Sequence, residues 1–404
     1  MQKFPKLTIF VLAFGLIAFL PAQVLGYDDQ TTHPALTREI VDFYNSVFPE
    51  KPLSSEEKGW IIQGSILEDT EPRYLNHFYD PISGEGWTGE EAGRISKEAV
   101  RKFSLAQSLE KPLSAVEWAK NDLIQESYRL LGGNHSWESG LRSYAEGNKK
   151  AAYITLGHIL HLLEDMGVPD HTRNDTHAEP VGAFTGDEGS PYEKYASRWT
   201  RENIGELRLK DGIHEAVSRA SIEEHLKAVA AYSNRYFFSK DTILKYSYPK
   251  VVFEEGKFGL GLDEKGIKFK LVKLENIKEE NVFGKSYSLR DKEEFDPIFY
   301  DYFLHLSKQV IVHGAGVIEL YRHEAENKEV NLEFEKNSDP FGYNMRKFGR
   351  ATTVPNLSLS NLLKTSGLGI LNFGRTATAN IGDNITGAWN TISSGMSGLF
   401  RDNE

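Results

Sequence analysis

The stretch HILHLLEDMGVPDH, residues His158–His171, decides the fold because it combines a helical apolar pattern with side chains that bind metals. Its apolar residues recur at helical spacing, and Pro169 ends the helix that this spacing predicts. His161 and Asp165 are four residues apart, so they lie on one face of that helix. A carboxylate buried among apolar side chains needs a cationic partner, which a metal ion can provide. The stretch therefore predicts a metal site within a helical core.

Histidines gather around this stretch. Four of the twelve histidines in the chain fall within twenty residues, namely His158, His161, His171 and His177. The chain has no cysteine, and zinc accepts imidazole nitrogen and carboxylate oxygen where no thiolate is present. A lone histidine and aspartate at this spacing are more often a surface pair or core residues. The cluster of four histidines favours zinc over that alternative.

The first 26 residues are predicted to be a secretory signal peptide rather than part of the fold. Lys3 and Lys6 precede an apolar run, Leu7–Leu20, which is too short to favour a membrane span. Val24 and Gly26 then suit a cleavage site after Gly26, with an uncleaved anchor as the alternative. Export without any cysteine is typical of a bacterial secreted or periplasmic protein, which is the expected location.

Helical patterns dominate residues 27–246, with apolar residues at spacings of three and four. One such pattern extends from Leu141 to Val168 and is expected to form a single long helix. Residues 294–330 show another helical pattern and are expected to complete the bundle. The predicted fold class is therefore mainly α, a multi-helix bundle with a small β insertion.

The β insertion is predicted at residues 247–293. Its sequence KFGLGLDEKGIKFKLVKLE alternates and predicts a hairpin with the turn at Asp263–Gly266. Residues 331–404 are rich in Ser, Thr, Asn and Gly and are expected to form a low-order tail, with a surface-seeking helix near Ile381–Phe400 as the alternative. The net charge of -11 argues against a general nucleic-acid-binding surface.

Three separate patterns together resemble a known family. His33 lies in THPALT, His77 lies in NHFYDP, and both precede the H-x3-D-x5-H pattern that begins at His161. In this order they resemble the zinc-dependent phospholipase C family, whose helical fold is shared with the single-strand-specific zinc nucleases. The resemblance covers roughly residues 27–245. It implies a phospholipase C-like bundle with up to three zinc ions in one cleft.

The resemblance also implies which residues hold each zinc. The first zinc would be held by Asp69, His77, His161 and Asp165. The second would be held by His171, a further histidine and a carboxylate. The third would be held by His33, a shared Asp165, and the amine and carbonyl oxygen of Tyr27 after signal cleavage. The family often has tryptophan at that first position, so Tyr27 is a departure. His158 has no family counterpart and is expected to be a hydrogen-bonding partner or core histidine, with a ligand role as the alternative.

The second zinc site departs further from the family pattern. Glu193, in SPYEKYASRW, fits the carboxylate, but Gly189 stands four residues before it, where the family has histidine. The nearest histidine is His177, which we therefore assign as the ligand with Glu193. The alternatives for that ligand position are Asp175, Asp187 and Glu188.

These residues predict a secreted zinc-dependent phosphodiester hydrolase, most consistent with a phospholipase C that cleaves phospholipid head-group phosphoesters with a zinc-activated water. Asp69 is the candidate general base or water-orienting residue, as the resemblance implies. The alternatives are a single-strand nuclease of the same fold and a non-catalytic zinc-binding envelope protein. A peripheral membrane contact would suit a phospholipid substrate, whereas no stable nucleic-acid partner is expected.

Overall fold

The computed structural model describes residues 27–70, 73–88, 112–127, 132–175, 190–207, 215–239, 249–275, 286–288, 296–340 and 344. These residues belong to one compact unit of the chain. The predicted signal peptide, His177 and the chain beyond 344 lie outside the described residues. The described part is mainly helical with one small sheet, which confirms the predicted fold class.

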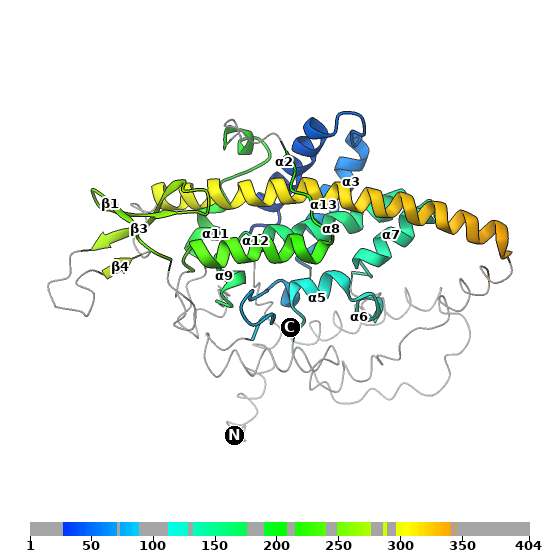
Figure 1. The fold of residues 1–404 in the computed structure, drawn as a ribbon, viewed down its shortest axis with the longest axis horizontal. Helices are drawn as coiled ribbons and strands as arrows, with labels where there is room; N and C mark the ends of the chain where they lie inside the picture. The colour runs from blue at the N-terminus through cyan, green and yellow to red at the C-terminus, as the bar shows by residue number, and fades with distance from the viewer. Residues whose placement is uncertain are drawn as a thin grey trace, which may run out of the picture. The chain divides into compact units, whose positions relative to one another are not determined.

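The centre of the bundle is α8 (Lys149–Asp165), whose C-terminal half is buried on all sides. It packs on α3 (Ser55–Glu68), α2 (Thr32–Val47) and α7 (Trp137–Ala145) (Figure 1). Glycines allow α3 and α8 to touch through their backbones. A Cβ added at Gly64 would lie 1.9 Å from the carbonyl oxygen of Ile154, and one at Gly157 would lie 2.0 Å from that of Ile61. The ends of α3 and α8 are therefore held close together.

The long pattern predicted from Leu141 to Val168 is two helices in the structure, so that prediction was wrong. Gly147 adopts a φ of 85° after α7, a conformation that glycine reaches without strain. Asn148 then caps α8, because its side chain accepts the N–H of Ala151 at 3.2 Å. The prediction failed because the apolar spacing continues across this turn, and the sequence marks the break between the two helices with a single Gly-Asn pair.

The longest helix is α13, Asp296–Ser338, drawn from yellow to orange in Figure 1. It extends past residue 330, so the expected low-order tail does not begin at 331. The segment 331–338 (NLEFEKNS) contains no proline or glycine, and most of its side chains are polar and exposed. Such a polar sequence can continue a helix without a packed face, and Pro340 follows shortly after its end.

Shorter helices surround this framework. They are η1 (Arg73–Asn76), α5 (Ala115–Lys120), α6 (Asp122–Ser127), α9 (Pro169–Thr172), α11 (Pro191–Ala196), η2 (Ile204–Leu207) and α12 (Ile222–Tyr236). Pro169 opens α9 at its first position, where proline costs no backbone hydrogen bond. The chain therefore turns directly after α8 and brings His171 back toward the bundle.

The small sheet has four antiparallel strands in sequence order: β1 (Phe253–Glu255), β2 (Phe258–Leu262), β3 (Lys268–Glu275) and β4 (Ser286–Ser288). The hairpin turn lies at Asp263–Gly266, as predicted. The Asp263 carboxylate accepts the N–H groups of Lys265 and Ile267, and Gly266 has a φ of 73°. The sheet is anchored on α13, since the Tyr302 hydroxyl donates to the Leu271 carbonyl at 2.8 Å.

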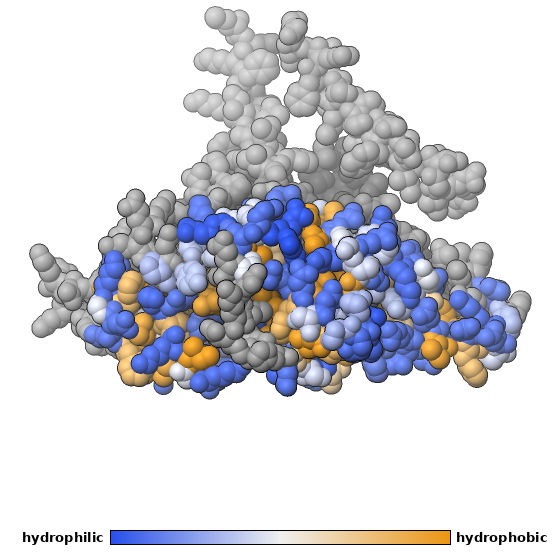
Figure 2. Space-filling view, turned by 90° about the horizontal axis from the view of Figure 1, so that it is seen from above, coloured by the Kyte–Doolittle hydropathy of each residue, from blue (hydrophilic) through white to orange (hydrophobic). Residues whose placement is uncertain are grey.

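None of the helices in the described ranges is both long and apolar enough to cross a membrane. Figure 2 shows hydrophilic side chains interspersed with separate apolar patches on the visible face.

Replacement of Gly64 by alanine is expected to destabilise the bundle. The new methyl group would meet the Ile154 carbonyl and separate α3 from α8, at a cost of about 1–3 kcal/mol in the free energy of unfolding. Urea denaturation measures this. Gly59→Ala on the same helix is the matched control, because its Cβ would meet nothing within 4 Å. It is expected to stabilise the protein by about 0.5–1 kcal/mol. Equal effects at both positions would contradict the close backbone contact.

Candidate metal centre

Five of the predicted zinc ligands meet where α2, α3, η1 and α8 end or begin. His33 comes from the first turn of α2, Asp69 follows α3, and His77 follows η1. The last turn of α8 supplies His161 and Asp165. All five side chains are buried, with the Asp69 side chain 3% exposed. The structure therefore brings together residues that are up to 132 positions apart in the chain.

Asp165 lies at the middle of this cluster. Its Oδ1 is 3.4 Å from Nε2 of His33, and its Oδ2 is 3.3 Å from Nε2 of His161. The same Oδ2 is 2.9 Å from Nδ1 of His77. Asp69 approaches two of these rings, with its Oδ1 3.4 Å from Nδ1 of His77 and 3.4 Å from Nε2 of His161.

Four of these five separations, at 3.3 or 3.4 Å, match the distance between two ligands of one metal ion, whereas the 2.9 Å between His77 and Asp165 is shorter. Ligand atoms about 2.1 Å from a tetrahedral zinc lie about 3.4 Å apart. That distance is long for a hydrogen bond between nitrogen and oxygen. Two groups have ligand atoms that all lie within 4.8 Å of one another: His33, His161 and Asp165 form one, and Asp69, His77 and His161 form the other.

The ligand atoms of the cluster also lack other partners. Among the described residues, both carboxylate oxygens of Asp69 and of Asp165 accept no hydrogen bond. The Nε2 atoms of His33 and His161 make none either. Buried polar atoms are rarely left this way, because each unmet group costs free energy. A cation bound between them would satisfy all of these atoms, so the donor set fits zinc.

The opposite nitrogens of the rings are fixed by acceptors. Nδ1 of His33 lies 2.6 Å from Oε2 of Glu164, whose Oε1 accepts the Thr37 hydroxyl at 2.6 Å. Nδ1 of His161 lies 2.7 Å from the Ser65 carbonyl oxygen. Each acceptor holds the proton on Nδ1 and leaves the Nε2 lone pair directed at the cluster, which is how ligand histidines are commonly oriented.

His171 and Glu193 form the edge of the site. Nε2 of His171 is 3.6 Å from Oε1 of Glu193, and its Nδ1 is 3.0 Å from the His77 carbonyl oxygen. Glu193 lies in the first turn of α11, which Ser190 caps. No group of three ligands forms around this pair within the described residues. His177, Asp187 and Glu188 lie outside them, and Asp175 is described and buried.

Tyr27 lies beside His33, with the two rings 5.7 Å apart. Its side chain is fully buried, and its hydroxyl is 2.5 Å from that of Tyr192 and 3.4 Å from the carbonyl oxygen of Gly167. The predicted first residue of the mature chain is thus anchored next to the cluster by its side chain.

The charges of the cluster are strongly coupled. Burial lowers the pKa of His161, but the carboxylates of Asp69 and Asp165 outweigh it and leave that pKa well above its usual value. Burial raises the pKa of Asp165, yet the neighbouring histidines outweigh it and hold this pKa well below the ordinary range. At Glu193 burial and the nearby Asp170 both raise the pKa well above normal. The histidines and aspartates of the cluster therefore stabilise each other's charged forms, while the crowding of carboxyl groups at Glu193 disfavours a further negative charge that a bound cation would offset.

Sequence reasoning missed the two glutamates that support the cluster. Both precede a candidate ligand in a Leu-Glu-Asp sequence: Glu68 before Asp69, and Glu164 before Asp165. In each pair the aspartate faces the cluster, while the glutamate is buried against a histidine: Glu164 against the candidate ligand His33, and Glu68 against His158. His158 pairs through Nδ1 with Glu68 and stacks on His135 with ring centroids 3.7 Å apart. The repeated motif at two helix ends was the available signal.

Comparisons with known proteins give only slight structural similarity. No family model matches the chain, and no curated protein sequence matches it. Among solved structures, the chain is similar to an alpha toxin from Clostridium absonum, with a TM-score of 0.35 and 12% sequence identity. The similarity covers 75% of this chain and 65% of the toxin chain.

Zinc is expected to stabilise the protein through this cluster. At one hundred times its dissociation constant, zinc should raise the free energy of unfolding by about 2.7 kcal/mol, and EDTA should reverse the shift. Asp165→Asn should abolish it, because Asp165 contacts three of the rings. Thermal melts with and without zinc measure this. Asp122→Asn is the control, since Asp122 pairs with Arg142 and should keep the shift. A wild-type midpoint that does not respond to zinc would refute the site.

Proposed function

We propose that this chain is a zinc-dependent phosphodiester hydrolase of the phospholipase C type. The observation that carries the proposal is the pair of buried carboxylates, Asp69 and Asp165, whose oxygens make no hydrogen bond among the described residues and lie at ligand spacing from three histidines. Together with the order of motifs that resembles the zinc-dependent phospholipase C family, this donor set favours hydrolysis of a phosphoester.

The residues would divide among up to three zinc ions. The first zinc would take Asp69, His77, His161 and Asp165. The second would take His171 and Glu193, with His177 as the assigned third ligand. The third would take His33, Asp165 and the amine and carbonyl oxygen of Tyr27 after cleavage behind Gly26. When bound, the zinc ions would supply Lewis-acid activation of a water and neutralisation of the phosphate charge.

The chain's own residues would orient this chemistry. Asp69 would hold the attacking water or accept its proton, because its carboxylate lies in the cluster with both oxygens available. Glu164 and the Ser65 carbonyl would fix the rings of His33 and His161. The low exposure of these side chains would exclude bulk water and strengthen each electrostatic contact.

Two other functions use the same residues. A single-strand nuclease would need a basic track for its substrate, and the net charge of -11 disfavours it. A non-catalytic zinc-binding envelope protein is favoured only by Gly189, which stands where the resembling family has a zinc ligand.

The test uses the mature protein purified from a secretion host. Zinc per chain is measured by elemental analysis, with release of phosphocholine from phosphatidylcholine vesicles and of acid-soluble nucleotides from single-stranded DNA. Bound zinc with phosphocholine release is the expected result. Asp69→Asn should lower that rate by about 10²–10⁴-fold. Asp122→Asn should leave it unchanged.

The other outcomes separate the alternatives. Nucleotide release without phosphocholine release would assign the site to a nuclease. Bound zinc with neither product would support the binding protein. Absence of zinc would refute the whole proposal.

A further inference from the structure

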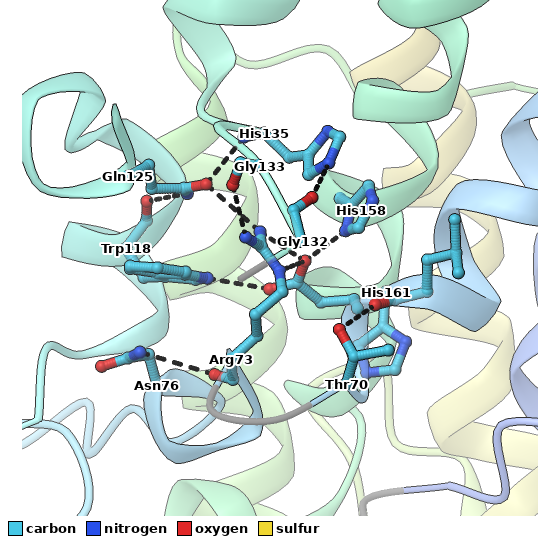
Figure 3. A network of polar contacts seen from close by, with 12 residues as sticks. Thr70, Arg73, Asn76, Trp118, Gln125, Gly132, Gly133, His135, His158 and His161 are labelled. Carbon is cyan, nitrogen blue, oxygen red and sulfur yellow. Dashed lines mark hydrogen bonds and ion pairs between the residues drawn. The ribbon is translucent and has the colours of Figure 1, made fainter. Parts of the chain in front are cut away.

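Glu68 is a buried ionised group that the proposed chemistry does not use. It is the last residue of α3 and is fully buried. Its Oε1 accepts Nε1–H of Trp118 at 2.8 Å, and its Oε2 accepts Nε–H of Arg73 at 2.8 Å and Nδ1–H of His158. The Glu68 carboxylate also forms an ion pair with Arg73, whose Nη2 lies 2.7 Å from Oε2. Figure 3 shows Arg73, Trp118 and His158 directed toward one common point.

Arg73 connects this carboxylate to the segment between two candidate ligands. It opens η1, which leads directly to His77, and it is fully buried. Its guanidinium also donates to the carbonyl of Gly133 at 2.9 Å and to Oε1 of Gln125 at 3.2 Å (Figure 3). The Glu68–Arg73 pair thus fixes the chain directly after α3 and directly before His77.

His158 connects the same carboxylate to α8. It lies one helical turn before His161, and its ring is stacked on that of His135. Burial lowers the pKa of His135 to about 4, so that ring is neutral at physiological pH. Glu68 therefore contacts, through its partners, each of the pieces of chain that deliver Asp69, His77 and His161.

The ring of His77 is reversed relative to its neighbours. Its Nδ1 faces the cluster, 2.9 Å from Asp165, whereas its Nε2 lies 3.5 Å from Oε1 of Glu68. His33 and His161 instead turn Nδ1 to their acceptors and Nε2 to the cluster. At 3.5 Å these two atoms make no hydrogen bond. The charge of a carboxylate oxygen this close to Nε2 still favours the tautomer that carries the ring proton there, which leaves the Nδ1 lone pair for a metal.

We propose that Glu68 is a positioning residue of the metal centre, which holds His77 so that it binds zinc through Nδ1 while anchoring the chain that carries Asp69. This inference rests on the proposed zinc centre. Its competitor is a purely structural role for the Glu68–Arg73 pair. Buried ion pairs generally add little net stability, so a metal-linked role accounts better for placing one beside the ligands.

Glu68→Gln is the first test. The carboxylate of Glu68 is surrounded by nitrogens of Arg73, Trp118, His158 and His77, each of which carries a proton or can carry one. Glutamine has an NH₂ group in place of one carboxylate oxygen, so this NH₂ would face an N–H group and lose a hydrogen bond. We expect zinc to bind about 10–100-fold more weakly, measured by competition with a chromophoric chelator. Asp122→Asn, which also removes an arginine-paired carboxylate, is the matched control and should keep wild-type affinity.

A second variant separates positioning from folding. Glu68→Leu with Arg73→Met removes both charges together, which a folded protein tolerates better than removal of one. Urea unfolding in EDTA measures metal-free stability independently of zinc. If Glu68 positions His77, the double variant folds and still binds zinc about 10–100-fold more weakly. If the pair is only structural, the folded double variant binds zinc with wild-type affinity, and the proposal is wrong.

The ring nitrogen through which His77 binds zinc can be measured directly, and the result does not depend on the stability of the protein. Long-range proton–nitrogen spectra of zinc-loaded, ¹⁵N-histidine-labelled protein should show one ring bound through Nδ1, assigned to His77 by its loss in His77→Ala. That signal should disappear or shift in the double variant. An Nε2-bound His77 in the wild type would overturn the proposal while leaving the zinc hydrolase intact. A wild-type chain that binds no zinc would instead refute the hydrolase, and this inference with it.

Discussion

The backbone contact between α3 and α8 is the constraint on which the rest of the site depends. Gly64 and Gly157 remove the side chains that would otherwise separate these helices. The helix ends can then bring Asp69 within 3.4 Å of His161. A bundle with ordinary interhelical spacing of 8–10 Å would hold these two groups farther apart. The geometry of the site thus depends on two glycines, which let the helices approach because they have no side chain.

The same helix ends use neighbouring acidic residues in opposite ways. In each Leu-Glu-Asp sequence the aspartate faces the cluster, while Glu164 binds the Nδ1 side of the ligand His33 and Glu68 binds Arg73. Two adjacent residues on a helix point in directions about 100° apart, so one motif can supply both a ligand and its support. The two aspartates therefore keep their negative charge available to a cation, while the two glutamates are each paired with a hydrogen-bond donor.

Parts of the cluster and of the fold could be predicted from sequence because they follow local patterns. The spacing of His161 and Asp165 placed both on one helical face, and the turn at Asp263–Gly266 followed from glycine and aspartate. Other features depend on contacts between distant segments. The partners of Glu68 come from η1, α5 and α8, which no spacing relates. The break at Gly147 and the length of α13 were missed because apolar periodicity neither detects a short turn nor defines a helix with an exposed end.

Helix α13 contributes to both hydrophobic cores of the described chain. Its first turns, with Ile298 and Phe303, pack in the core that includes Tyr27, and its middle, with Val310 and Ile318, packs in the core that surrounds α8. Near the start of the chain, α2 meets the same helix, where Tyr44 donates to Glu319 at 3.1 Å. Contacts of such long sequence separation form slowly, because their loop-closure entropy must be overcome first. During synthesis the two cores can close only after residues near 320 have emerged, so the fold is completed late and as a whole.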